Sequence, residues 1–194
     1  MSHVYHGSNK PKLQTLQPRI SSHGKSYVYG TKHRAIAILF LSRWNDYLLS
    51  LSAVHSNDSL HITLTERYEN ALFDIFSGKS GYLYVLNDNN FFQDPACWDM
   101  ELVSEQAEIP VSCEVVRNIL PEIKKLAEVG VISLYHYPNK PAHMPLDDTD
   151  LIDKTIELYK TSGNLYNATY CIERFPHLEI SLRQKFLETF GIDF

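Results

Sequence analysis

The chain has 194 residues, of which 44% are hydrophobic and 21% charged, and its formal net charge is -5. This balance excludes an intrinsically disordered chain, and the length suits one well-buried core with a small appended unit. The negative charge and the lack of a polybasic stripe disfavour a protein that neutralises many phosphates of DNA or RNA. A small anionic ligand is still compatible with this charge, because a few local donors can hold it.

Two short strands are predicted near the start of the chain, and each ends in glycine followed by a hydroxyl residue. The first covers residues 3–5 and stops at a Gly-Ser pair, and the second covers residues 26–29 and stops at Gly30. Thr31 is then predicted to be the N-cap of an apolar helix over 35–41, because its hydroxyl can accept from an unpaired N–H of the first turn.

The middle of the chain contains further strand signals. Residues 60–64 alternate apolar and polar side chains, and 81–86 are the strongest strand signal, ended by a run of Asn and Asp. Residues 69–76 are apolar without a clear period and can be helix, strand or loop. Residues 101–104 and 111–116 bracket an acidic segment and indicate a strand pair or one bent strand.

From Pro121 onward, residues that typically start and end helices replace the alternating pattern of strands. The first of these helices starts near Pro121 and is expected to end at Gly130 in a left-handed cap. Three more follow, over residues 147–161, 165–175 and 178–190, with stops at Gly163, Pro176 and Gly191. The sequence therefore predicts an α+β core over residues 1–118 and a helical C-terminal extension over 119–194.

The three cysteines, Cys97, Cys113 and Cys171, are widely spaced and odd in number, which indicates reduced thiols in a cytoplasmic protein. The start of the chain lacks a basic segment followed by an apolar one, and no stretch approaches the ~18 to 20 apolar residues of a membrane span. We therefore expect no membrane association. The nine histidines have no metal-ligand spacing, so no metal is expected.

The motifs occur in an order that is known from a family of enzymes. Tyr5-His6-Gly7-Ser8 comes first, Tyr27-Val28-Tyr29-Gly30-Thr31 leads into the alanine-containing helix, and an acidic segment precedes a late strand. This order resembles the ADP-ribosyltransferase-like superfamily, most of all the group with a histidine, a tyrosine and a glutamate on three strands. Diphtheria-toxin-like and poly-ADP-ribose-polymerase-like catalytic domains belong to that group. The resemblance covers about residues 1–115 and implies a split antiparallel β-sheet core.

The resemblance implies roles for the first motif. His6 would hydrogen-bond a ribose hydroxyl of NAD, and Gly7 would let the backbone approach the nicotinamide amide. Glycine suits this position, because it permits close approach of main chain to a ligand, and backbone N–H and C=O groups can recognise a carboxamide. Ser8 would be a third polar contact.

The second motif would hold the nicotinamide ring. Tyr29 would stack on it, and offset stacking of aromatic rings contributes about 0.5 to 1.5 kcal/mol. Tyr27 lies two residues earlier on the predicted strand and so points to the same side, where it can share the wall of the site. Thr31 completes the expected NAD-binding set.

The third motif of the family is a glutamate that holds the nicotinamide ribose and stabilises an oxocarbenium-like transition state. Glu105 is the predicted residue, because the acidic run precedes the strand at Val111. Glu101 and Glu108 are alternatives, and Gln106 can occupy the position instead. With glutamine there, NAD binding would survive without transfer.

The resemblance implies an NAD-dependent ADP-ribosyltransferase that modifies a protein or nucleic acid. The alternative is a catalytically inactive nucleotide-binding or protein-interaction module on the same fold. A third hypothesis is a structural or partner-binding protein whose helical tail is the interface.

Overall fold

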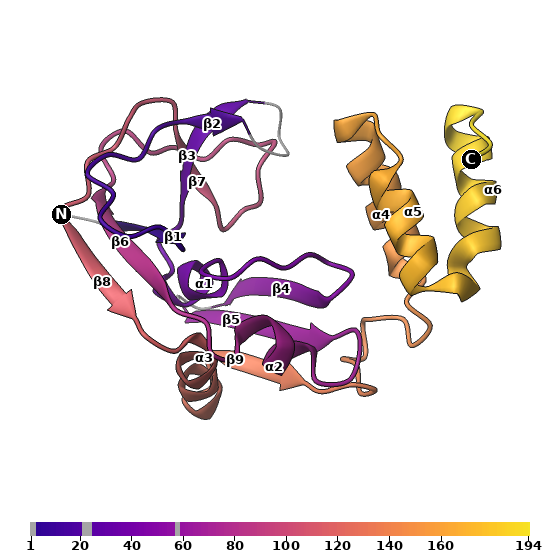
Figure 1. Ribbon diagram of the computed structural model, residues 1–194, viewed down its shortest axis with the longest axis horizontal. Helices are drawn as coiled ribbons and strands as arrows, with labels where there is room; N and C mark the ends of the chain where they lie inside the picture. Colours follow the sequence, from indigo (N-terminus) through magenta and orange to yellow (C-terminus); the bar gives the residue numbers. More distant parts are fainter. Residues whose placement is uncertain (1–2, 21–24, 57–58) are drawn as a thin grey trace.

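The computed structural model describes residues 3–20, 25–56 and 59–194, and these form an α+β protein, as predicted (Figure 1). In chain order the elements are β1 (His3–Ser8), β2 (Arg19–Ile20), β3 (Ser26–Gly30), α1 (Arg34–Leu39), β4 (Leu49–Ser56), β5 (Ser59–Glu66), α2 (Ala71–Phe76), β6 (Gly81–Asn87), β7 (Leu102–Ser104), β8 (Ser112–Val116), α3 (Ile119–Glu128), β9 (Ile132–Tyr135), α4 (Asp150–Ser162), α5 (Tyr166–Arg174), the 3-10 helix η1 (Pro176–Leu178) and α6 (Glu179–Phe190).

The described strands form three three-stranded sheets, in the orders β1-β6-β8, β2-β3-β7 and β4-β5-β9. Neighbouring strands are antiparallel, except that β5 and β9 are parallel. A short bridge joins the first two sheets. The N–H of Tyr5 donates to the carbonyl of Thr31 at 2.8 Å, and the N–H of Thr31 donates to the carbonyl of Tyr5 at 3.0 Å. This bridge brings the strand with His6 beside the strand with Tyr29.

The largest apolar core surrounds α1, which lies near the middle of the molecule and packs against β1 and α3 (Figure 1). Residues 35–39 of α1 are all buried, as expected for a helix that is apolar on every side. Residues 69–76, which the sequence left open, contain the helix α2, and its buried residues join the same core.

Several strands differ from the sequence analysis. β4 and β9 lie where no strand was predicted, and both pair with β5. The segments around 101–104 and 111–116 do form strands, but β7 pairs with β3 and β8 with β6, so they are neither a strand pair nor one bent strand. α3 and β9 follow residue 118 yet bury their isoleucines in the main core. The helical unit therefore begins with α4.

The C-terminal helices α4, α5, η1 and α6 stand together at one end of the molecule (Figure 1). They have a core of their own, to which Tyr47 of the sheet region also belongs. Gly130 follows α3 with φ of 79°, so its predicted left-handed cap is confirmed. The predicted stops at Gly163 and Gly191 are confirmed as well, and both residues are left-handed, with φ of 66° and 70°.

A group of buried charges joins this helical unit to the sheets. Arg67 directly follows β5. Its guanidinium group forms ion pairs with Asp148 and Asp150 at the start of α4, each with an N–O distance of 2.6 Å. The ammonium of Lys140 also lies 2.6 Å from Asp148. The side chains of Arg67 and Lys140 are each only 2% exposed. Nearby, the hydroxyls of Tyr47 and Thr155 hydrogen-bond at 2.9 Å.

Two simpler expectations can be compared with the structure. Cys97, Cys113 and Cys171 are free thiols, with Cys113 exposed and the other two buried. Among the described residues, every helix is too short or too polar to traverse a bilayer.

Candidate functional site

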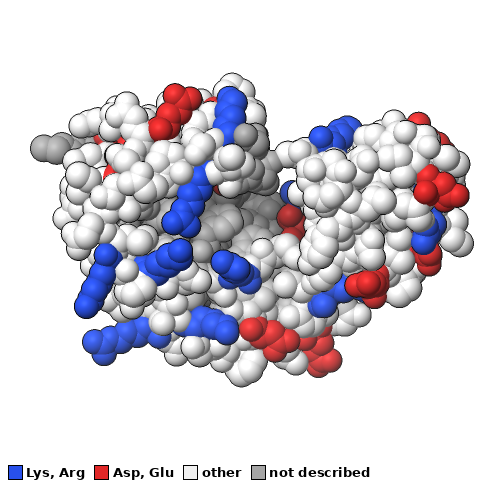
Figure 2. Space-filling view, turned by 45° about the horizontal axis from the view of Figure 1, so that its top comes forward, with Lys and Arg blue, Asp and Glu red and all other residues white. Residues whose placement is uncertain are grey.

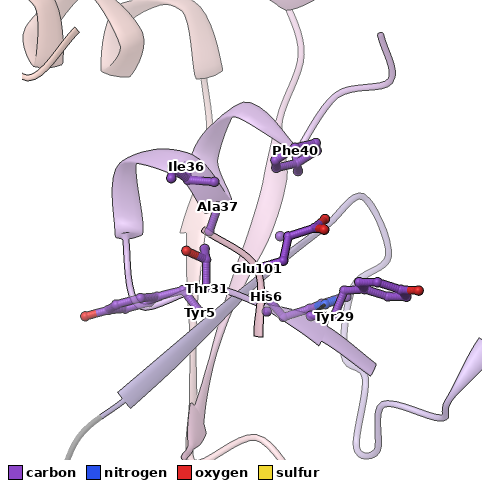
Figure 3. Close-up of a pocket in the computed structure, with 10 residues that line it drawn as sticks. Tyr5, His6, Tyr29, Thr31, Ile36, Ala37, Phe40 and Glu101 are labelled. Atoms are coloured by element: carbon purple, nitrogen blue, oxygen red, sulfur yellow. Dashed lines mark hydrogen bonds between the residues drawn. The ribbon is translucent and has the colours of Figure 1, made fainter. Parts of the chain in front are cut away.

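A cavity of about 270 Å³ opens between β1, β3, α1 and the loop that precedes β7 (Figure 3). It contains four of the residues predicted to bind NAD and one predicted alternative for the glutamate. Its lining consists of Tyr5, His6, Gly7, Tyr29, Gly30, Thr31, Ile36, Ala37, Phe40 and Glu101. Residues from four separate segments of the chain thus meet at one site, because the Tyr5–Thr31 bridge holds β1 against the end of β3.

The ring of His6 is fixed by a hydrogen bond to the neighbouring strand. Its Nδ1 lies 2.7 Å from the carbonyl oxygen of Tyr29. A carbonyl oxygen only accepts, so Nδ1 carries the proton, and Nε2 of the neutral ring is an acceptor. Burial lowers the pKa of His6, the bond to Tyr29 partly opposes this, and the charge of Arg19 lowers it further. The ring is therefore neutral at neutral pH.

Acidification is expected to destabilise the folded protein through His6. Its folded-state pKa lies below the unfolded value of about 6.5, so the unfolded chain takes up the proton first. The stabilisation is complete above about pH 6.5 and is lost as the pH falls through the folded-state pKa. Denaturant unfolding between about pH 7.5 and 5 should show a smaller loss of stability in His6→Asn than in the wild type. Equal losses would contradict this role of His6.

The ring of Tyr29 packs against the ring of Tyr27. The two rings meet edge to face, with centroids 5.9 Å apart and an interplanar angle of 76°. The hydroxyl of Tyr27 donates to the carboxylate of Asp94 at 2.6 Å, and Lys25 bonds to the same oxygen at 2.8 Å. Tyr27 is buried and does not line the first cavity, so it positions Tyr29 and does not contact that space.

Gly7 has a packing role that the sequence analysis did not anticipate. A Cβ atom at residue 7 would lie 2.3 Å from the carbonyl oxygen of Ala37 in α1. Distances this short do not occur between a Cβ and a backbone oxygen, so any side chain at Gly7 would push α1 away from β1. Gly30 is constrained in the same way, because its Cβ would lie 2.3 Å from Cγ1 of Val4.

Thr31 lines the cavity but is not the N-cap of α1, so that prediction was wrong. α1 begins at Arg34, and His33 is its N-cap. The hydroxyl oxygen of Thr31 accepts from the N–H of His33 at 3.2 Å, one turn before the helix. The backbone N–H and carbonyl of Thr31 both bond to Tyr5. Thr31 is therefore paired as in a strand, and the helix begins after it.

Among the acidic candidates for the third motif, Glu101 lines the cavity. Leu102 pairs with Gly30 in the β3–β7 ladder, so the residue just before it lies next to the end of β3. In Figure 3 the Glu101 side chain lies above the rings of His6 and Tyr29, on the side of the strands that faces α1. This register, which no local pattern indicated, makes Glu101 the carboxylate of the site.

The other candidates lie outside the cavity. Glu105 and Gln106 are exposed in the loop after β7. Glu108 is buried, and its carboxylate accepts a hydrogen bond from the Ser104 hydroxyl at 2.7 Å. Its backbone also pairs with Leu16, so Glu108 secures this loop.

A second cavity of about 300 Å³ adjoins the first and shares His6 and Tyr29 with it. Three basic residues, Lys10, Arg19 and Arg43, line it, and none of its described lining residues is acidic. None of these three side chains forms an ion pair with another described residue. On the face shown in Figure 2, Lys and Arg side chains likewise gather beside the central hollow. The second cavity is suited to an anion.

Ser8 and Tyr27 belong to this second cavity and not to the first. The Ser8 oxygen accepts from the N–H of Lys10 at 3.2 Å, which shapes the turn after β1. The expected ligand set is therefore divided between two adjoining spaces, with His6 and Tyr29 common to both.

No protein-family model, curated protein or solved structure matches this chain. Its function has to be inferred from the geometry and chemistry of the two cavities.

Proposed function

We propose that this protein is an NAD-dependent ADP-ribosyltransferase with a split-sheet core of the ADP-ribosyltransferase type, and that His6, Tyr29 and Glu101 form its active site. The observation that supports this is that an imidazole, a phenol ring and a carboxylate from three separate segments line one cavity of about 270 Å³. These groups suit nicotinamide riboside, which has a flat cationic ring, ribose hydroxyls and a cleavable C–N bond.

The two rings would bind and orient the nicotinamide half of NAD. Tyr29 offers an aromatic face for the nicotinamide, and a stacked pair contributes about 0.5 to 1.5 kcal/mol. His6 is held in one tautomer by its bond to the Tyr29 carbonyl, so Nε2 can accept from a ribose hydroxyl. The backbone at Gly7 and the residue Thr31 line the same space and would contact the carboxamide.

Glu101 would assist the bond cleavage. The bond between the ribose C1′ and the nicotinamide nitrogen breaks, its electron pair stays on that nitrogen, and neutral nicotinamide leaves. A lone pair of the acceptor then forms the new bond to C1′, and the acceptor loses a proton. Positive charge develops on the ribose during this step, and a fixed carboxylate stabilises it electrostatically.

The second cavity would hold the rest of the dinucleotide. The pyrophosphate of NAD is an anion, and Lys10, Arg19 and Arg43 provide three cations that are not engaged in ion pairs with described residues. Since His6 and Tyr29 line both cavities, NAD would run past them from one space into the other. Ser8 and Tyr27 would then contact the adenosine diphosphate half.

Tyr29→Ala is expected to weaken NAD binding by about three- to tenfold, the loss of one stacked ring. His6→Ala should have an effect of similar size, because one hydrogen bond contributes about 0.5 to 1.5 kcal/mol. Isothermal titration with NAD measures both. Tyr166→Ala is the control, since Tyr166 is 71% exposed on α5 and lines neither cavity.

The same titration decides between the proposed functions when it is combined with an assay of nicotinamide release. Binding together with release supports the transferase. Binding without release supports the inactive nucleotide-binding module. Absence of NAD binding by the wild type, or equal binding by Tyr29→Ala, would contradict both.

A further inference from the structure

Two histidines meet in a third cavity, whose lining includes Lys32 and Met100, the chain neighbours of Thr31 and Glu101 in the first cavity. His33 precedes α1, His55 lies on β4, and their Nε2 atoms are 3.0 Å apart. The ring centroids are 4.6 Å apart with an interplanar angle of 49°. The cavity measures about 620 Å³, and Asp99 also lines it.

The two distances between the rings can be compared with those of two imidazoles bound to one metal ion. Imidazoles that bind one ion at about 2.0 to 2.1 Å and at nearly a right angle have nitrogens about 3 Å apart and centroids about 4.7 Å apart. A straight N–H···N hydrogen bond would separate the centroids by about 5.3 Å. His33 and His55 are hydrogen-bonded in this structure, and their 3.0 Å between Nε2 atoms and 4.6 Å between centroids match the spacing of two ligands of one ion.

The pair is open to solvent on one side. His55 itself is exposed, so an ion can reach the pair from the open cavity.

We propose that His33 and His55 form a site for one divalent transition-metal ion that accepts ligands at right angles, such as Ni²⁺ or Cu²⁺. Within the described ranges no three metal-ligating side chains converge, so water would complete the coordination; Asp99 and Lys32 also line the cavity. The bound ion ties the start of α1 to β4. This site is independent of the proposed transferase function.

Isothermal titration of the untagged, metal-free protein with Ni²⁺ at about pH 7.5 tests the site. We expect one ion per chain, and binding at least about tenfold weaker in His33→Ala and in His55→Ala. His61→Ala is the matched control, because His61 is an exposed histidine on β5 whose Nε2 bonds to the Ser133 hydroxyl at 3.1 Å. Binding by the control should equal that of the wild type.

Two further measurements separate this site from loose surface binding. Cu²⁺ added at one equivalent should give an electron paramagnetic resonance spectrum with coupling to two nitrogens, which is lost in His55→Ala. Ni²⁺ should raise the melting temperature of the wild type and of His61→Ala but not of His55→Ala. Absence of stoichiometric binding, or equal binding by the wild type and both site variants, would overturn the proposal.

Discussion

Replacing Glu101 by glutamine is expected to slow nicotinamide release from NAD by about 10² to 10³-fold, while NAD binding changes little. The amide keeps the shape of the side chain but removes its negative charge. That charge matters most in the transition state, where the ribose becomes positive, and less in the ground state, where stacking and hydrogen bonds hold the ligand. Glu101 lines the cavity with His6 and Tyr29, so its charge lies where the ribose would be.

The measurement is nicotinamide release by chromatography, together with titration of NAD into each variant. Glu105→Gln is the matched control, because Glu105 is exposed, lies four residues further along the chain and does not line the cavity. Its release rate should equal that of the wild type. If Glu105→Gln lost turnover while Glu101→Gln kept it, the carboxylate of the proposed site would be the wrong one.

Arg67→Ala is expected to lower the free energy of unfolding by about 3 to 5 kcal/mol. The Arg67 side chain is 2% exposed and bonds to the carboxylates of Asp148 and Asp150. Without Arg67, the buried Asp148 keeps only Lys140 as an ion-pair partner among the described residues. Asp150 loses the one ion-pair partner that it has among those residues. The cost falls mainly on Asp148, whose side chain is 11% exposed and cannot recover its hydration, whereas Asp150 is 35% exposed.

Urea unfolding of the wild type and of Arg67→Ala measures this loss. Arg34→Ala is the control, since Arg34 also pairs with a carboxylate, that of Glu114, but both side chains are more than a third exposed. Such a pair contributes about 0 to 1 kcal/mol. A loss in Arg67→Ala no larger than in Arg34→Ala would mean that the buried charges do not secure the helical unit.

The sequence already indicated which residues to test in the first cavity, but not how they meet. His6 and Tyr29 were selected from the order of two short motifs, and both line the cavity. Their contact depends on the bridge between Tyr5 and Thr31, a pairing of backbone groups that carries no signature in side-chain types. The carboxylate was not determined in advance, because acidic residues stand on both sides of β7 and only its register with β3 selects Glu101.

What the sequence alone determined is the local structure: the α+β class, the buried helix around residues 35–39, and the helix ends at Gly130, Gly163 and Gly191. These depend on backbone preferences and periodicities that neighbouring residues express by themselves. Only the tertiary structure decided the parallel pairing of β9 with β5, the union of Arg67 with Asp148 across 81 residues, and the meeting of His33 with His55. Such contacts join segments distant in the chain, and their partners are chosen by the packing of the whole core, which no short stretch of residues encodes.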